Sequence, residues 1–166
     1  MYLPNRSINC STIYRSTRTY MISAFSFLPD FDDSIVSGAD IDFGTNINAN
    51  GYLQYDDPGA LTRRAVCGLP VRDGERITSV ILCIREDAAE EVAARLYKIA
   101  YTTGVRTQVG STATSNNGTG DELLLVFAGT EDVDSGSFYW IEIDATPTAS
   151  SLRIYGAIIQ VSVPAP

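Results

Sequence analysis

The fold of this chain is indicated most clearly by one stretch, Arg76-Ile77-Thr78-Ser79-Val80-Ile81-Leu82-Cys83-Ile84-Arg85. Its centre, Val80–Ile84, is apolar throughout and contains β-branched residues, which strands favour. Because these apolar residues do not alternate with polar ones, the pattern predicts a strand covered on both faces. A facing sheet would cover one face. The N-terminal segment or another subunit would cover the other.

Turn signals and a second strand precede this stretch. The residues Val71-Arg72-Asp73-Gly74 predict a turn that requires Gly74. Farther upstream, Asp56-Asp57-Pro58-Gly59 predicts another turn, since proline presets φ and glycine tolerates a positive φ. Between the two turns, Arg63–Leu69 reads as a strand that Pro70 ends.

Short runs of β-branched and aromatic residues, bounded by Gly, Pro, Asn and Asp, recur along the chain. They predict further strands at Ser34–Phe43, Tyr52–Tyr55, Thr107–Thr114, Glu122–Ala128, Ser137–Ala145 and Leu152–Val163. Gly156 is expected to mark a bulge or a close approach in the last strand. Eight or nine short strands at this spacing predict an all-β, antiparallel two-sheet β-sandwich of jelly-roll type. A single sandwich domain is expected over residues 34–163.

The segment Glu86–Tyr101 admits two interpretations. The residues Asp87–Leu96 have good helix propensity. However, Val92, Ala94, Leu96 and Lys98 share one parity, as one side of a strand would, and the flanks are hairpin-like. We therefore expect an acidic turn at Glu86–Glu90 and then a strand over Glu91–Tyr101, with a helix as the alternative.

Residues 1–33 are expected to form an N-terminal arm whose first part is basic. Of the 12 basic residues, 3 lie before residue 30, whereas all 20 acidic residues follow it. The arm is a targeting segment, an extension that docks on an acidic neighbour, or an artefact of an upstream start codon, with translation from Met21. The apolar stretch Met21–Leu28 is short and interrupted by serines, which disfavours a secretory signal.

The charge of the whole chain narrows its partners. A net charge of −8 and a pI near 4.4 argue against binding to nucleic acid or to an anionic membrane. No apolar run approaches the ~20 residues that a membrane span needs.

The sequence contains no histidine, which removes the commonest general base and the commonest zinc ligand. Paired carboxylates remain as catalytic candidates at Asp40 with Asp42 and at Glu142 with Asp144. Because alternate positions of a strand share a face, a solvated sheet face explains both pairs without chemistry. The chain is therefore expected not to be an enzyme.

Two acidic loops are candidate calcium sites, because calcium takes six to eight oxygen ligands. Their carboxylates are Asp30, Asp32 and Asp33 in the first loop, and Glu131, Asp132 and Asp134 in the second. Neither loop completes a known calcium-binding pattern, and plain solvated turns are the alternative.

Aromatic residues suggest a sugar-binding alternative, because flat rings stack on pyranose rings. Tyr52 and Tyr55, beside the Asp56-Asp57 turn, are the candidate platform. Trp140, between Tyr139 and Ile141, is expected to lie in the core.

Cysteine usage does not fix the compartment. The chain has 3 cysteines and no C-x-x-C spacing. Cys67 and Cys83 lie in apolar runs and are expected to be buried thiols, with a bridge between them as the alternative.

Four motifs carry a resemblance. They are Leu69-Pro70-Val71-Arg72-Asp73-Gly74-Glu75-Arg76-Ile77-Thr78-Ser79, Ala94-Arg95-Leu96-Tyr97, Phe138-Tyr139-Trp140 and Leu152-Arg153-Ile154-Tyr155-Gly156. Their succession resembles uncharacterised, often exported bacterial β-sandwich domains of jelly-roll type, over residues 65–163. The resemblance implies the fold and a strand over Glu91–Tyr101, and it implies no activity.

The leading functional hypothesis is a structural or assembly module, such as a subunit of a virion, a filament or a surface layer. It would form a homo-oligomer through its sheet faces and its arm. The alternative is a carbohydrate-binding or adhesion module stabilised by calcium. An extracellular, surface or virion-associated location is favoured over the cytoplasm.

Overall fold

The computed structural model describes residues 14–29, 52–54, 63–86, 91–115, 120–146 and 152–164. These residues form two antiparallel sheets and one short 3-10 turn. The elements are β1 (Tyr14–Ser23), η1 (Ala24–Ser26), β2 (Leu28–Pro29), β3 (Leu53–Gln54), β4 (Arg63–Gly68), β5 (Arg76–Glu86), β6 (Glu91–Ala100), β7 (Val105–Thr114), β8 (Gly120–Asp132), β9 (Ser137–Thr146) and β10 (Arg153–Pro164).

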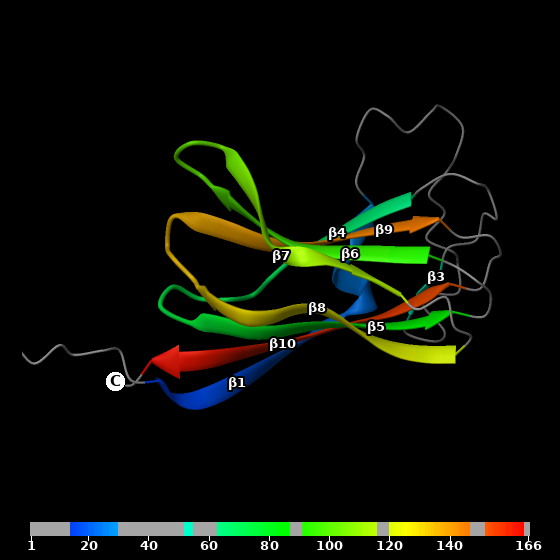
Figure 1. The fold of residues 1–166 in the computed structure, drawn as a ribbon, viewed down its shortest axis with the longest axis horizontal. Helices are drawn as coiled ribbons and strands as arrows, with labels where there is room; N and C mark the ends of the chain where they lie inside the picture. The colour runs from blue at the N-terminus through cyan, green and yellow to red at the C-terminus, as the bar shows by residue number, and fades with distance from the viewer. Residues whose placement is uncertain are drawn as a thin grey trace, which may run out of the picture.

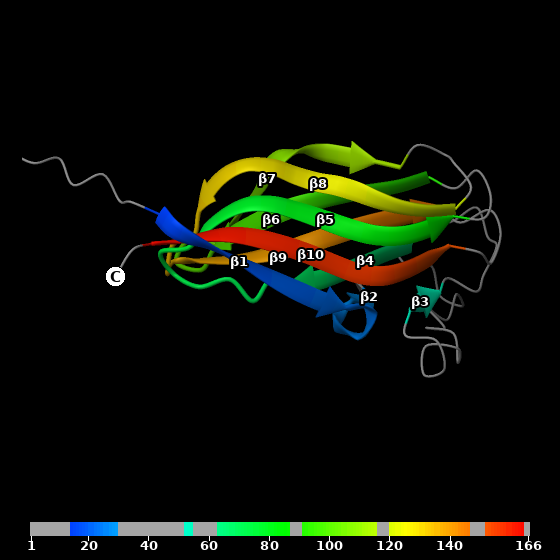
Figure 2. The same ribbon diagram turned by 90° about the horizontal axis from the view of Figure 1, so that it is seen from below.

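The two sheets lie face to face (Figure 1). Sheet A has the order β1-β10-β5-β8, with β3 also paired to β10, and sheet B has the order β2-β4-β9-β6-β7. Figure 2 shows the four long strands of sheet A side by side. The predicted all-β, two-sheet antiparallel sandwich is confirmed.

The strand pairing is that of a jelly roll. The neighbours β6 and β7 form the innermost pair, and around them β5 pairs with β8, β4 with β9 and β1 with β10. These four pairs are nested, so the chain follows the course of one long hairpin that has been rolled into two sheets. Both ends of the described chain therefore lie together in β1 and β10.

The core lies between the sheets, because each long strand turns one set of alternate residues inward. The largest fully buried apolar side chains are Ile77, Val80, Leu82, Ile84, Leu96, Ile141, Ile143, Leu152, Ile154 and Ile159. Every long strand contributes to this core, including the edge strands β1 and β7 through Ile22 and Val109, at 8% and 7% exposure.

Most predicted strands are found, with shifted ends. Residues Glu91–Ala100 form the strand β6, so the predicted strand is confirmed and the alternative helix is not formed. The predicted turn begins too early, because Glu86 is the last residue of β5. The predicted strand Ser34–Phe43 lies outside the described residues.

Among the described residues of the single chain, β5 is covered on one face only, and cover of its other face by another subunit stays a prediction. Its side chains alternate, with Val80, Leu82 and Ile84 buried and with Ile81 and Cys83 on the outer face and only half-buried. The outer position of these two residues gives sheet A an apolar outer surface.

The expected boundary between arm and sandwich also shifts. Residues 14–23, placed in the arm by the sequence, form β1 and pair with β10. Glu75, at 3% exposure, accepts hydrogen bonds from Arg18 at 2.8 Å and from the Tyr20 hydroxyl at 2.8 and 3.0 Å. The basic segment therefore docks on an acidic residue of its own chain.

Two glycine predictions are confirmed. Gly74 has a φ of 80° in the turn before β5, and its N–H donates to the carbonyl of Val133 at 3.0 Å. Gly156 has a φ of 145° and lies where the register of β10 against β5 shifts, which is the expected bulge.

Candidate functional site

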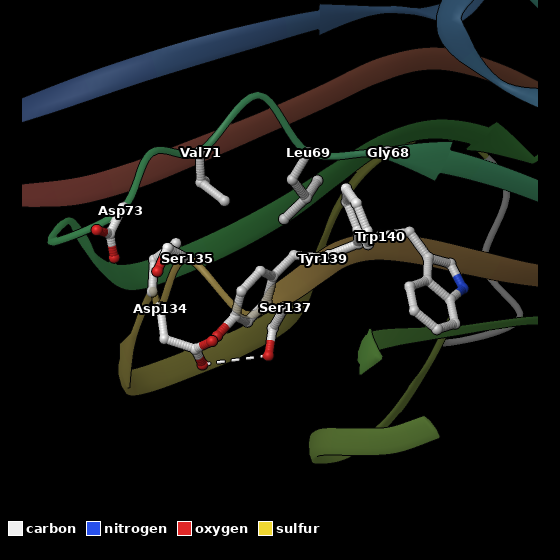
Figure 3. A pocket seen from close by; sticks show the side chains of 11 residues that line it. Gly68, Leu69, Val71, Asp73, Asp134, Ser135, Ser137, Tyr139 and Trp140 are labelled. Carbon is white, nitrogen blue, oxygen red and sulfur yellow. Dashed lines mark hydrogen bonds between the residues drawn. The ribbon is translucent and has the colours of Figure 1, made fainter. Parts of the chain in front are cut away.

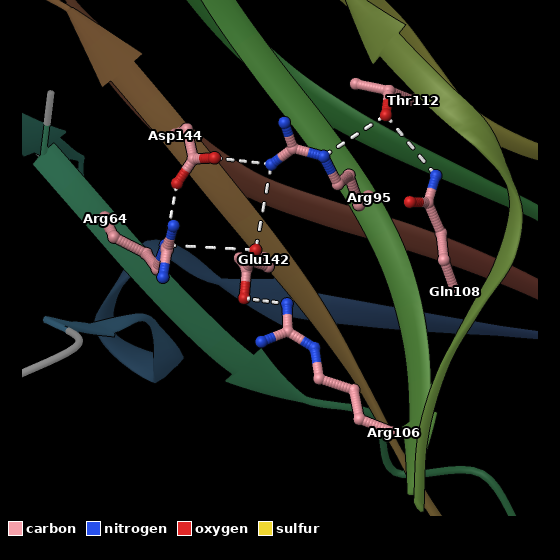
Figure 4. Close-up of polar contacts among 7 residues, drawn as sticks. All are labelled: Arg64, Arg95, Arg106, Gln108, Thr112, Glu142 and Asp144. Carbon is pink, nitrogen blue, oxygen red and sulfur yellow. Dashed lines mark hydrogen bonds and ion pairs between the residues drawn. The ribbon is translucent and has the colours of Figure 1, made fainter. Parts of the chain in front are cut away.

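The outer face of sheet B carries an ion-pair network in which carboxylates lie beneath arginines (Figure 4). The side chain of Glu142 is only 3% exposed and accepts from Arg106 at 2.6 Å. Asp144 accepts from Arg64 at 2.8 Å and from Arg95. This pair was expected on a solvated face. It does share the outer face, but the guanidinium groups cover it.

The network sets the ionisation of Asp144. Burial alone would raise its pKa, but hydrogen bonds and charges from Arg64 and Arg95 outweigh burial and lower the pKa. Asp144 thus stays ionised at neutral pH and serves as an anchor for two guanidinium groups.

Beside this network lies a stack of aromatic rings. Trp140 stacks on Tyr97 with ring centroids 5.5 Å apart, and the Arg106 guanidinium lies 3.8 Å from the Tyr97 centroid. The expectation that Trp140 is a core residue is wrong. Trp140 is half-buried on the outer face, and Tyr139 points inward at 4% exposure.

Tyr139 closes one end of the core with polar contacts. Its hydroxyl donates to Glu131 at 3.2 Å and to the carbonyl of Asp132 at 3.2 Å. Lys98 also donates to Glu131, at 2.6 Å. Burial and the neighbouring carboxylates raise the pKa of Tyr139, so its proton is retained.

The three carboxylates of the second candidate calcium loop have separate partners. Glu131 pairs with Lys98, Asp132 pairs with Arg76 at 2.6 Å, and Asp134 accepts from the Gly136 N–H at 2.8 Å. Among the residues that the structure describes, no group of three His, Cys, Asp or Glu side chains is arranged to hold a metal ion. Asp30, Asp32 and Asp33 of the first loop lie outside the described residues.

The candidate sugar platform is placed only in part. Tyr52 is half-buried, with its ring edge-on to Tyr155 at 5.9 Å and the Arg153 guanidinium 5.1 Å from its centroid. Tyr55 lies outside the described residues, so the two rings are not shown together.

An apolar band crosses the outer face of sheet A. The register aligns Met21, Ile158, Ile81 and Leu125 in one row across four strands. In the next row, Cys83 pairs with Leu123. Met21, Leu123 and Leu125 are 82%, 67% and 51% exposed, so the band faces outward. We call these six residues, with Tyr155, the sheet A band.

Ion pairs within the sheet border the band at both ends. Arg76 pairs with Asp132 at 2.6 Å at one end, and Arg85 pairs with Asp121 at 3.5 Å at the other. A hollow of about 250 Å³ opens beside Cys83, Leu123 and Tyr155. The surface is therefore uncharged at its centre and internally neutralised at its border.

Neither described cysteine forms a disulfide. Cys67 is buried and Cys83 is half-buried, and both are free thiols. Burial raises the pKa of the Cys67 thiol to about 11 and raises that of Cys83 as well. Cys67 faces the core, whereas Cys83 lies in the sheet A band.

The sequence analysis missed this band, although a signal for it existed. Leu123–Phe127, like Val80–Ile84, is apolar without alternation. Two such runs in strands that prove to be neighbours place apolar side chains on both faces of one sheet. Predicting the band requires knowing that β5 pairs with β8, and local sequence patterns do not indicate which strands pair.

Comparisons with known proteins identify no family. No protein-family model matches the sequence, and no curated protein sequence matches it either. One chain in a solved structure entitled "Structure of infectious bursal disease virus Gt strain" is similar, with 14% identity and a TM-score of 0.46. The match covers 98% of this chain and 37% of that chain, so this chain spans little more than a third of its length. The described residues include no helix long and apolar enough to cross a membrane.

Proposed function

We propose that this chain is a non-enzymatic structural subunit that binds a second copy of itself through the sheet A band. The observation that carries the proposal is the continuous row Met21–Ile158–Ile81–Leu125, formed from all four long strands of the sheet. Exposed apolar patches of this continuity mark interaction sites in soluble proteins. The absence of histidine from the sequence supports a role without catalysis.

A second copy is the partner that this surface favours. The band is a regular sheet face, and two such faces pack on each other about 10 Å apart. In a two-fold dimer the same patch serves both partners, so an uncharged band meets an uncharged band. The border pairs Arg76–Asp132 and Arg85–Asp121 are already neutralised within each copy. Two acidic chains can thus meet there without opposing unpaired charges.

The dimensions suit the centre of an interface. The exposed part of the band amounts to on the order of 400 Å², the size of the largest apolar patch on an ordinary monomer, which is often functional. A stable interface buries about 800 Å² on each partner, with an apolar centre and a polar rim. Thr17, Thr19 and Gln160, exposed on the same face, supply such a rim.

The experiment measures the solution mass of the full chain by light scattering and sedimentation over a range of concentrations. The variant Leu125→Lys places a charge in the centre of the band, so we expect a dimer or larger oligomer to dissociate by at least tenfold in Kd. Val105→Lys is the matched control, since Val105 is 59% exposed but lies on sheet B. A monomeric parent chain, or equal dissociation by both variants, would refute the proposal.

Truncation at Met21 is a less specific test. It would remove most of β1, including Arg18 and Tyr20, and so disturb the fold together with any contact. The thiol of Cys83 offers a gentler one. In a Cys10→Ser background, its alkylation should slow as the concentration of protein rises, whereas buried Cys67 stays unreactive throughout.

The proposed subunit would belong to a virion, a filament or a surface layer, at an extracellular, surface or virion-associated location. The arm is proposed to contribute through residues that precede β1. Calcium binding by either acidic loop stays a prediction, and a calcium titration of the thermal unfolding temperature tests it.

A further inference from the structure

A cavity of about 400 Å³ opens at one end of the sandwich, between the segment that follows β4 and the turn before β9. Figure 3 shows Leu69 and Val71 on one wall and Asp134, Ser137 and Tyr139 on the other. The volume lies in the range of small-molecule sites. The walls are apolar, with oxygen atoms at the rim.

Gly68 opens one side of this cavity. It is the last residue of β4 and lies opposite Trp140 in the register of β4 and β9. Its φ is not in the left-handed region, and an added Cβ would meet no atom within 4 Å. Neither backbone conformation nor packing therefore requires glycine, which weakens a strand. The missing side chain leaves the flank of Trp140 uncovered.

The indole of Trp140 is held in place from its other side. It stacks on Tyr97 with an interplanar angle of 22°, and Arg106 lies over Tyr97. Arg106 is itself bound to Glu142 at 2.6 Å. This chain of contacts fixes the ring before any ligand arrives, and a preorganised surface loses less entropy on binding.

The lining selects the chemistry of the ligand. Asp73, Asp134, Ser135 and Ser137 place carboxylates and hydroxyls around the cavity, and none of the described side chains that line it is basic. Asp134 and Ser137 are already joined by a hydrogen bond of 3.2 Å. An anionic ligand would face two carboxylates, and the Arg106 guanidinium, 5.6 Å from the centre of the Trp140 ring, is already bound to Glu142. A neutral polyol ring has hydroxyl donors for these oxygens and an apolar C–H face for an aromatic ring.

We infer that this cavity binds a neutral glycan, with the C–H face of one sugar unit on Trp140 and the hydroxyls of a further unit toward Asp134 and Asp73. The site shares no lining residue with the sheet A band. It adds a ligand-binding activity to the proposed structural role, and either can hold without the other.

The test uses the full chain on an array of neutral glycans, followed by fluorescence titration with each soluble oligosaccharide that binds. Trp140 is the only tryptophan in the sequence, so its emission reports on the site directly. We expect a saturable change in emission. Gly68→Leu should fill the space beside the indole and weaken binding at least tenfold at an unchanged unfolding temperature.

Val66→Leu is the matched control, because it adds volume two residues earlier on the same face of β4, opposite Glu142. It should leave binding unchanged, and so should Leu125→Lys in the sheet A band. The inference is overturned if no neutral glycan binds at millimolar concentration, or if Gly68→Leu binds as the parent does. Binding of choline or of lysine-rich peptides in place of glycans would overturn it too.

Discussion

The carbonyl oxygen of Ile22 occupies the space that a Cβ atom of residue 156 would need. Gly156 also has a φ of 145°, a conformation that side-chain-bearing residues rarely adopt. Gly156 pairs with Ser23, the residue after Ile22, where β1 and β10 meet, next to the bulge that β10 makes against β5. The glycine therefore permits β1 to lie against the rest of sheet A.

Gly156→Ala should destabilise the chain by about 3 kcal/mol, because backbone strain and a clash with backbone act together. For a domain of this size that corresponds to a fall of roughly 10 °C in Tm. Thermal unfolding followed by circular dichroism measures it. Gly68→Ala is the control and should be nearly neutral, since its Cβ meets nothing within 4 Å. Equal Tm values for both variants would show that β1 can shift away from residue 156 without loss of stability.

Glu75→Gln should loosen β1 specifically. The carboxylate is buried and also accepts from the Arg72 N–H at 2.9 Å, so it joins β1 to the turn before β5. Losing charge-assisted bonds to Arg18 and Tyr20 should cost about 2 kcal/mol. Trypsin cleavage after Arg18 should become several times faster. The exposed neighbour Asp73, changed to Asn, should leave the rate as it is, and an unchanged rate for Glu75→Gln would contradict the anchoring role.

The sequence predicted the sandwich well because its strand signals are local. Runs of apolar residues identify the β5 and β9 segments as strands. The shared parity of Val92, Ala94 and Leu96 correctly favoured a strand at β6. The anchoring of β1 could not be read in this way. Arg18 and Glu75 lie 57 residues apart, and the sequence around either residue does not indicate that the two side chains will bind each other.

The orientation of β9 shows a different limit. Tyr139 and Trp140 are adjacent aromatic residues, so burial tendency alone does not choose between them. Ile141 and Ile143 share the parity of Tyr139, and that set faces the core. Trp140 shares its parity with Glu142 and Asp144 instead. Reading the whole strand, rather than one residue, would have placed the indole outside and would have pointed to the aromatic side of sheet B.

Acid should weaken the outer network of sheet B through Asp144. Its pKa in the folded chain lies below 3.8, the ordinary value, because Arg64 and Arg95 outweigh burial. A group with a lowered pKa binds fewer protons when folded than when unfolded. Its contribution to stability is therefore complete above the ordinary carboxyl pKa and declines as the pH falls through the folded value.

Asp144→Asn should accordingly cost about 2 kcal/mol at pH 7, because Arg64 and Arg95 then keep only their longer contacts to Glu142, at 3.8 and 3.7 Å. The difference in unfolding free energy between parent and variant should become smaller below pH 3.8, since protonation removes the same charge from Asp144 in the parent. Urea unfolding at pH 7, 5 and 3 measures this difference.

Asp121→Asn is the control, because Asp121 is 72% exposed and its pair with Arg85 is long at 3.5 Å. That variant should cost under about 1 kcal/mol at every pH. If the difference in unfolding free energy between parent and Asp144→Asn stays constant with pH, the charge of Asp144 does not contribute to holding β4, β9 and β6 together.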